Sequence, residues 1–316
     1  MMRLTLLIIL SVNLFLSFGQ NSPNWDKEKI VVTKKDHVST ILHADELFLG
    51  RWDELAQPLF WKKIMLLSPD TSLINIAETR EVLMKISSKT WQAQTEPQKL
   101  AFKDSLRKAY QLDSNAVINV TTGKNDFYRF NEVYPSLTKG VAAFEKQGVD
   151  PWYAQAILLI ESPAQLKKSI KGAYGAFQLM PDVARSMGIV VNDKVDERGD
   201  FDKCAYAAAR LIHRICIPEA KKILNRHNIA YNTNDLWFRL FVLHVYHAGA
   251  MNVAAVVNKI QPCEGSQELI LEMWRNKAAH FGAGSQNYTQ LALAAQLILH
   301  EKIYIECDDI KPFEAR

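Results

Sequence analysis

The chain has 316 residues, 48% of them hydrophobic and 23% charged, with a formal net charge of +4. This composition is that of a packed globular protein and excludes a disordered or low-complexity chain. The excess of positive charge is small and spread along the sequence, so no nucleic-acid partner is expected. It is compatible with an anionic polymer such as a cell wall.

The first residues have the pattern of an export signal. After Arg3 the chain is mostly Leu, Ile, Val and Phe up to Phe18, and Ser17 and Gly19 are small residues where a signal peptidase reads the chain. We therefore predict a signal peptide over residues 1–19 and an exported protein, periplasmic or associated with the cell envelope. An uncleaved N-terminal anchor is the alternative, although the apolar run is shorter than the roughly 20 residues of a membrane-spanning helix.

Residues 20–133 form a region of unknown role that we expect to be mostly helical. The apolar spacing predicts helices over 52–67, 74–86 and 98–110, and a strand over 116–120. No repeat or linker divides the region. Its possible role is to recruit a partner, such as a protein of the envelope or of a secretion machine.

From residue 134 to 316 the sequence predicts one helical domain. Helices are expected over 134–147, 152–160, 201–215, 236–245 and 288–305. The second and fourth are apolar almost all round, as in central, buried helices. We expect them to bury each other, so that residues 134–316 fold alone. The expected fold class is mainly α.

Four cysteines, at positions 204, 216, 263 and 307, allow two disulfides in three pairings or four free thiols. None lies in a C-x-x-C pair, so no metal site is expected. Cys263 and Cys307 lie at loop or terminal positions, and we predict a disulfide between them. Cys204 lies on the packed face of a helix, where a free buried thiol is expected.

Glu161 ends the apolar helix over 152–160 and is the candidate catalytic residue. Burial disfavours a charged carboxylate, and the C-terminus of a helix repels an anion, so both effects raise the pKa of Glu161. A carboxylic acid that holds its proton near neutral pH can act as a general acid. The alternative is an exposed carboxylate paired with Lys167 or Lys168.

The residues that follow resemble the lytic transglycosylase domain of the goose-type lysozyme clan. The likeness begins with the pair Glu161-Ser162, then Ser169, then GAYGAFQLMP at 172–181, where the family pattern is GA-x-G-L-M-Q-L-M-P. It continues with an Asp-x-Arg at 196–198, an Ala-rich stretch at 207–209, Tyr-His-Ala-Gly at 246–249 and Asn-Tyr at 287–288. In motif style it is most like the group of membrane-bound lytic murein transglycosylase D.

This resemblance implies a lysozyme-like helical domain that cleaves peptidoglycan glycan strands between N-acetylmuramic acid and N-acetylglucosamine. Glu161 would protonate the leaving oxygen and then accept the proton of the muramyl 6-hydroxyl, which closes a 1,6-anhydro ring. One carboxylate suffices and no cofactor is expected. The substrate-binding residues implied by the resemblance are Ser162, Ser169, Tyr174, Gln178, Tyr246, His247 and Tyr288.

The sequence departs from the family pattern at two functional positions. The loop from Glu161 to Ser169 is about one residue shorter than usual, and His247 replaces an Asn, which either keeps the hydrogen bonding or adds a second titrating group. Two other functions remain open. One is a catalytically weak wall-binding or scaffold protein that uses the same residues, and the other is a muramidase that uses water in place of the 6-hydroxyl.

Overall fold

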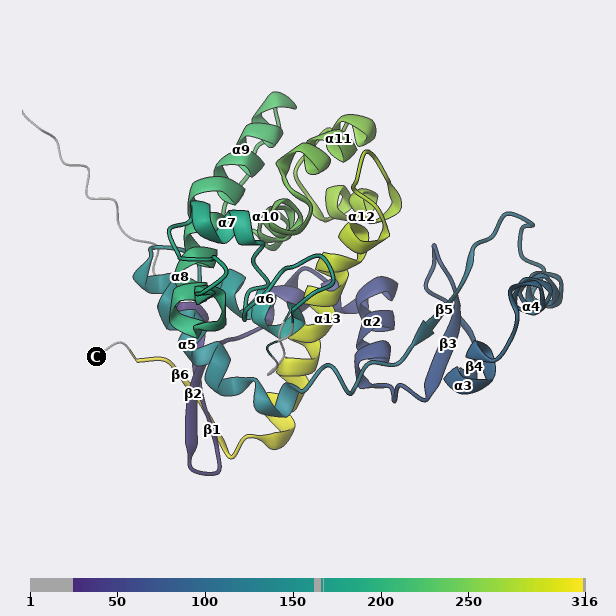
Figure 1. Cartoon of the computed structure of the whole chain (residues 1–316), viewed down its shortest axis with the longest axis horizontal. Helices are drawn as coiled ribbons and strands as arrows, with labels where there is room; N and C mark the ends of the chain where they lie inside the picture. Colours follow the sequence, from purple (N-terminus) through teal and green to yellow (C-terminus); the bar gives the residue numbers. More distant parts are fainter. Residues whose placement is uncertain (1–24, 162–165, 167, 315–316) are drawn as a thin grey trace, which may run out of the picture.

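The computed structural model describes residues 25–161, 166 and 168–314, and is mainly α (Figure 1). The predicted signal peptide therefore lies outside the described residues. The helices are α1 (Asp45–Leu49), α2 (Ala56–Leu66), α3 (Ser88–Gln92), α4 (Glu96–Ala109), α5 (Tyr134–Lys146), α6 (Trp152–Glu161), α7 (Pro181–Ser186), α8 (Phe201–Leu211), α9 (Ile217–Arg226), α10 (Leu236–Ala248), α11 (Ala250–Ile260), α12 (Gln267–Arg275) and α13 (Ala283–Glu306). The strands are β1 (Lys29–Lys34), β2 (His37–Leu42), β3 (Thr71–Ile76), β4 (Val82–Ser87), β5 (Ile118–Thr122) and β6 (Asp309–Pro312). No helix within these ranges is both long and apolar enough to cross a membrane.

The long helix α13 is the axis of the helical body. It packs against α6, α10 and α2, as Figure 1 also shows. Every residue of α6 from Trp152 to Ile160 is buried, because α5, α13 and β2 surround this helix. The predicted helices of this part are confirmed, but α6 and α10 bury themselves mainly against α13 and other neighbours, not against each other.

The first strand and the last strand of the described chain pair in one sheet. The order is β2-β1-β6, all antiparallel, and Val31 lies opposite both Thr40 and Lys311. Residues of β1, β2 and α2, such as Val32, Ile41 and Ile64, belong to the same hydrophobic core as α6 and α13. The predicted boundary at residue 134 therefore crosses this core.

Residues 71–122 form a small lobe beside the helical body. Its sheet has the order β4-β3-β5, and Ile74, Leu106 and Ile118 form a separate small core between the sheet and α4. The helix predicted over residues 74–86 is wrong, since this segment is a β-hairpin that turns at Arg80 (φ 62°). With this hairpin and the β1–β2 hairpin, the N-terminal region is mixed α and β, which corrects the expectation that it is mostly helical.

Gln155 joins the N-terminal hairpin to α6 through buried hydrogen bonds. Its side-chain amide donates to the Leu42 carbonyl at 3.0 Å and to Gln296 at 2.8 Å, and its oxygen accepts from the Leu42 amide at 2.9 Å. A buried carboxamide is tolerated in an apolar helix only when its polar atoms are paired. Gln155 is the one polar side chain between Trp152 and Ile160, and it ties β2 to the helix that carries Glu161.

All four cysteines are free, so the predicted Cys263–Cys307 disulfide is wrong. Cys263 lies between α11 and α12, whereas Cys307 follows the far end of α13, next to β1. α12 packs at the N-terminal end of α13, a helix of 24 residues that spans roughly 36 Å. A disulfide needs Cα atoms within about 7 Å. The prediction of a free, buried Cys204 is confirmed.

Candidate active site

Glu161 is the last residue of α6 and carries a carboxyl that is only partly open to solvent. Burial raises the pKa of Glu161 from 4.5 to about 7, and only the nearby Tyr288 hydroxyl acts in the opposite direction. The pKa of Glu161 is therefore raised, as expected from its place at the end of an apolar helix. No lysine among the described residues contributes to this pKa, and Lys168 lies exposed near Asp196.

Three tyrosines from distant parts of the chain surround the Glu161 carboxyl. Tyr288 comes from the first turns of α13, Tyr246 from the last turn of α10, and Tyr128 from the segment before α5. Burial raises the pKa of each phenol, and the nearby Glu161 charge raises it further. The Tyr246 hydroxyl donates to the Phe177 carbonyl at 2.6 Å. The buried Tyr288 hydroxyl has no fully formed hydrogen bond and faces Glu161, so it is the group free to donate to this carboxylate.

His247 stacks on the ring of Tyr288. The ring centroids are 4.3 Å apart and the planes are inclined by 26°. Desolvation and the positive charge of Lys171 lower the pKa of His247 to about 4, although the residue is exposed at the surface. His247 is therefore neutral at pH 7, and it packs on the Tyr288 ring as an uncharged imidazole.

The loop over residues 169–180 is folded by its own hydrogen bonds. Ser169 accepts from the Ala173 amide at 2.9 Å through its hydroxyl, and makes no hydrogen bond with Glu161. Tyr174 and Leu179 exchange two backbone hydrogen bonds, which close a tight turn. Gln178, at a positive φ of 47°, donates from its carboxamide to the Gly175 carbonyl at 3.0 Å.

The Asp-x-Arg motif holds this loop in place. The buried Arg198 guanidinium makes a bidentate pair with Asp196 at 2.8 and 2.6 Å, and donates to the carbonyls of Gly172 and Leu179, each at 2.8 Å. Gly175 lies against the Arg198 backbone at a φ of +87°, and a Cβ atom there would be 2.1 Å from the Arg198 carbonyl oxygen. The glycine is required by this close approach.

The structure places the residues that the sequence singled out in two groups, and it adds two residues that the sequence analysis did not single out. Ser162 lies outside the described residues. Tyr246, His247 and Tyr288 converge near Glu161, while Ser169, Tyr174 and Gln178 shape the neighbouring loop. Tyr128 was missed because it belongs to a region with no recognisable motif. Arg198 was missed as the holder of the loop, since an Asp-x-Arg pair alone indicates only a turn or surface ion pair.

Among the described side chains, the Glu161 carboxyl is the group suited to acid–base chemistry. No second carboxylate among them influences the pKa of Glu161. Within the same ranges, no group of three or more His, Cys, Asp and Glu side chains is placed to hold a metal ion. The arrangement is a partly buried acid with its proton near neutral pH, beside a phenol that can donate to it once it ionises.

Comparison with known proteins gave no assignment: no family model matches the chain, and no curated protein is significantly similar to it.

Proposed function

We propose that the protein is a lytic transglycosylase that cleaves peptidoglycan glycan strands, with Glu161 as its single general acid and base. The helical body would then be lysozyme-like. The observation that carries the proposal is a lone carboxyl at the end of a buried apolar helix, with its pKa raised to about 7 and next to a loop of the expected sequence. The ordered motifs from Glu161 to Tyr288 supply the choice of substrate.

The first step is proton transfer from Glu161 to the glycosidic oxygen between the two amino sugars. The leaving group departs with this proton, and Glu161 becomes a carboxylate in a site that favours the neutral acid. The Tyr288 hydroxyl, which has no fully formed hydrogen bond of its own, can then donate to this carboxylate and stabilise it.

In the second step the muramyl 6-hydroxyl gives its proton to Glu161, and its oxygen attacks the anomeric carbon to close the 1,6-anhydro ring. Most glycosidases that use water or a protein nucleophile have a second carboxylate, about 5 to 9.5 Å from the first. A nucleophile that is part of the substrate does not need one. This favours the transglycosylase over a hydrolytic muramidase.

The mass of the products tests the reaction. Purified full-length protein should release muropeptides that are lighter by one water than the products of a muramidase, because the anhydro end contains no added water. Products of hydrolytic mass would establish the muramidase instead. Binding to peptidoglycan with no new chain ends would establish the wall-binding or scaffold alternative.

We expect cleavage to slow as the pH rises through about 7. Glu161 must hold its proton when substrate binds, and the free enzyme loses this proton above its pKa of about 7. The value of kcat/KM should be highest below this pH and fall about tenfold per pH unit above it. The measurement is a pH profile of kcat/KM on glycan strands.

His247→Asn is the control for this profile. His247 is already neutral over this range, so its replacement should leave the alkaline limb in place. If His247→Asn shifts the alkaline limb of the kcat/KM profile, the titrating group is the imidazole and not Glu161.

The proposed location is outside the cytoplasm, at the cell envelope, where the polymer is found. An envelope or secretion-machine partner remains a proposal for the N-terminal region. Residues 29–66 contribute to the core of the helical body, whereas the lobe formed by residues 71–122 has a small core of its own, so we assign a partner surface to the lobe.

A further inference from the structure

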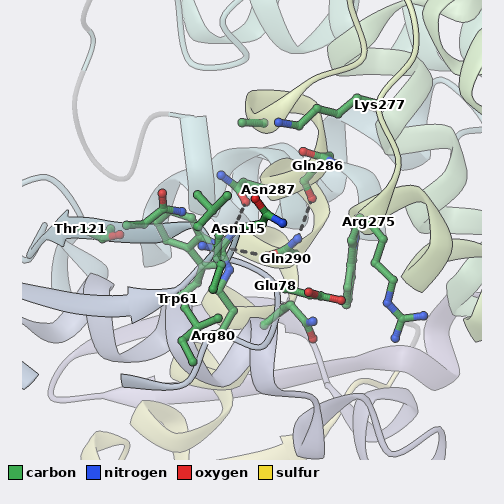
Figure 2. Close-up of a pocket in the computed structure, with 18 residues that line it drawn as sticks. Trp61, Glu78, Arg80, Asn115, Thr121, Arg275, Lys277, Gln286, Asn287 and Gln290 are labelled. Atoms are coloured by element: carbon green, nitrogen blue, oxygen red, sulfur yellow. Dashed lines mark hydrogen bonds between the residues drawn. The ribbon is translucent and has the colours of Figure 1, made fainter. Parts of the chain in front are cut away.

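A pocket of about 530 Å³ lies between the lobe and the helical body (Figure 2). Its size is that of a site for a small ligand. One wall comes from α2 and from the hairpin turn and β5 side of the lobe, and the other from the end of α12 and the first turns of α13. The pocket contains none of the residues placed around Glu161.

Hydrogen bonds fix the pocket walls, and one of them joins the lobe to the helical body. Arg80, at the hairpin turn, donates to the Asn287 side chain at 2.8 Å. The Trp61 indole donates to Gln290 at 3.0 Å, and the Gln286 carboxamide donates to the Asn276 carbonyl at 3.0 Å. The site is thus built in advance of any ligand.

Two cations in the pocket lack acidic partners. Within the described ranges, neither Arg80 nor Lys277 has a carboxylate within ion-pair distance, whereas Arg275 is paired with Glu268 and Glu272. The Arg80 guanidinium stacks on Phe60 and Trp61 and is partly buried, which lowers its pKa. Glu78 is the one carboxylate among the described lining residues, so Arg80 and Lys277 leave an excess of positive charge in the pocket. Excess positive charge at a partly desolvated position favours an anionic ligand.

The remaining lining suits a peptide better than a sugar. The carboxamides of Asn115 and Asn119 make no hydrogen bond among the described residues, and each offers donors and an acceptor of the kind that pair with peptide groups. Trp61 and Trp274 are buried, and their N–H groups bond to Gln290 and Thr289. Neither indole is open for a sugar ring to stack on.

The pocket shares a helix with the active site. Gln286, Asn287 and Gln290 line the pocket, while Tyr288, on an adjoining face of the same turns of α13, faces Glu161. A ligand in the pocket would therefore lie beside the same turns of α13 as a strand bound at Glu161. The proposed substrate offers such a ligand, because the muramic acid residues of peptidoglycan carry short peptides with free carboxylates.

We propose that this pocket binds the acidic stem peptide of the glycan strand, through Arg80 and Lys277, and so positions peptide-bearing strands for cleavage. This inference rests on the proposed function. It assigns a role in substrate selection to the lobe. The sequence suggested only partner recruitment for this region.

The experiment compares strands with and without peptides. Full-length protein is assayed on glycan strands that keep their stem peptides and on strands stripped by an amidase. The wild type should prefer the peptide-bearing strands. Arg80→Gln and Lys277→Gln should each reduce the ratio of the two kcat/KM values by about tenfold, since each removes a charge-assisted hydrogen bond.

Arg51→Gln is the matched control, because this exposed arginine pairs with Glu54 and lies outside the pocket. It should leave the ratio unchanged. Lys277 is exposed, and its side chain makes no hydrogen bond or ion pair among the described residues, so its variant keeps the test valid even if Arg80→Gln unfolds. A wild-type ratio near one, or one that neither variant changes, would overturn the inference and leave the proposed function intact.

A binding measurement separates the two hypotheses further. A synthetic stem tripeptide with two free carboxylates is titrated into the full-length protein and followed by calorimetry. We expect binding that Lys277→Gln weakens about tenfold. If neither kind of strand is cleaved, the proposed function fails, and this titration alone then decides the inference: absence of binding, or binding indifferent to Lys277, overturns it.

Discussion

Replacing Glu161 with Gln is expected to slow glycan cleavage by about three orders of magnitude or more, while the protein stays folded. The carboxamide has nearly the same shape as the acid but can neither give a proton to the leaving oxygen nor accept one from the 6-hydroxyl. No second carboxylate among the described residues influences the site, so no neighbouring acid can take over. The measurement is initial rate on purified strands at pH 6.

The stability of this variant checks that the loss is chemical. The folded chain holds the Glu161 proton up to about pH 7, whereas the unfolded chain releases it near 4.5. Wild-type stabilisation from this proton is complete below about pH 4.5 and is lost as the pH rises through 7. Glu161→Gln has no such loss, so it should unfold at a temperature equal to or above that of the wild type at pH 8.

Glu219→Gln is the matched control for activity, since Glu219 is on α9 and pairs with Lys222 near the surface. It should cleave strands at the wild-type rate. Substantial turnover by folded Glu161→Gln protein would remove Glu161 from the catalytic role and leave the motifs as a structural likeness only.

Local pattern was enough to predict the helix that carries the acid. Nine consecutive residues from Trp152 to Ile160 are apolar except Gln155, and such a run is buried on all sides whatever surrounds it. The raised pKa of Glu161 follows from the same run, because burial is its main cause. These predictions needed only neighbours in sequence.

Structural features that depend on contacts between residues distant in sequence could not be predicted. The hairpin over residues 71–87 has apolar positions that fit helical spacing, and only its pairing with β5 shows it to be β-structure. Tyr128 reaches Glu161 from 33 positions earlier, without a motif to mark it. The boundary at residue 134 crosses the core because β1 pairs with β6, about 280 positions later.

Arg239 is the strongest example of such a long-range dependence. It stands alone as a charged residue in the apolar helix α10 and is fully buried. Its guanidinium donates to Asp150 at 2.7 Å, to Glu46 at 2.9 Å and to Glu28 at 3.0 and 2.9 Å. Two of these carboxylates come from the N-terminal region, so the cluster joins it to the helical body.

Arg239→Met is expected to destabilise the protein by about 3 to 5 kcal/mol, the largest loss of stability that we expect from a single change. Methionine fills a similar volume, but it leaves Asp150, Glu46 and Glu28 close together without a cation. Burial already raises the pKa of Asp150 and of Glu46. Without the guanidinium these groups must either take up protons or separate, which releases the N-terminal hairpin from α10. Urea unfolding at pH 7 measures the loss.

Arg275→Met is the matched control, because this arginine also pairs with two glutamates but is about half exposed. Exposed pairs contribute about 0 to 1 kcal/mol, so its loss should stay within that range. Adding Glu28→Gln and Glu46→Gln to Arg239→Met should recover part of the stability, since it removes two of the unpaired charges. Equal losses for Arg239→Met and Arg275→Met would mean that the buried cluster does not hold the N-terminal hairpin in place, and that apolar packing of β1, β2 and α2 does so without it.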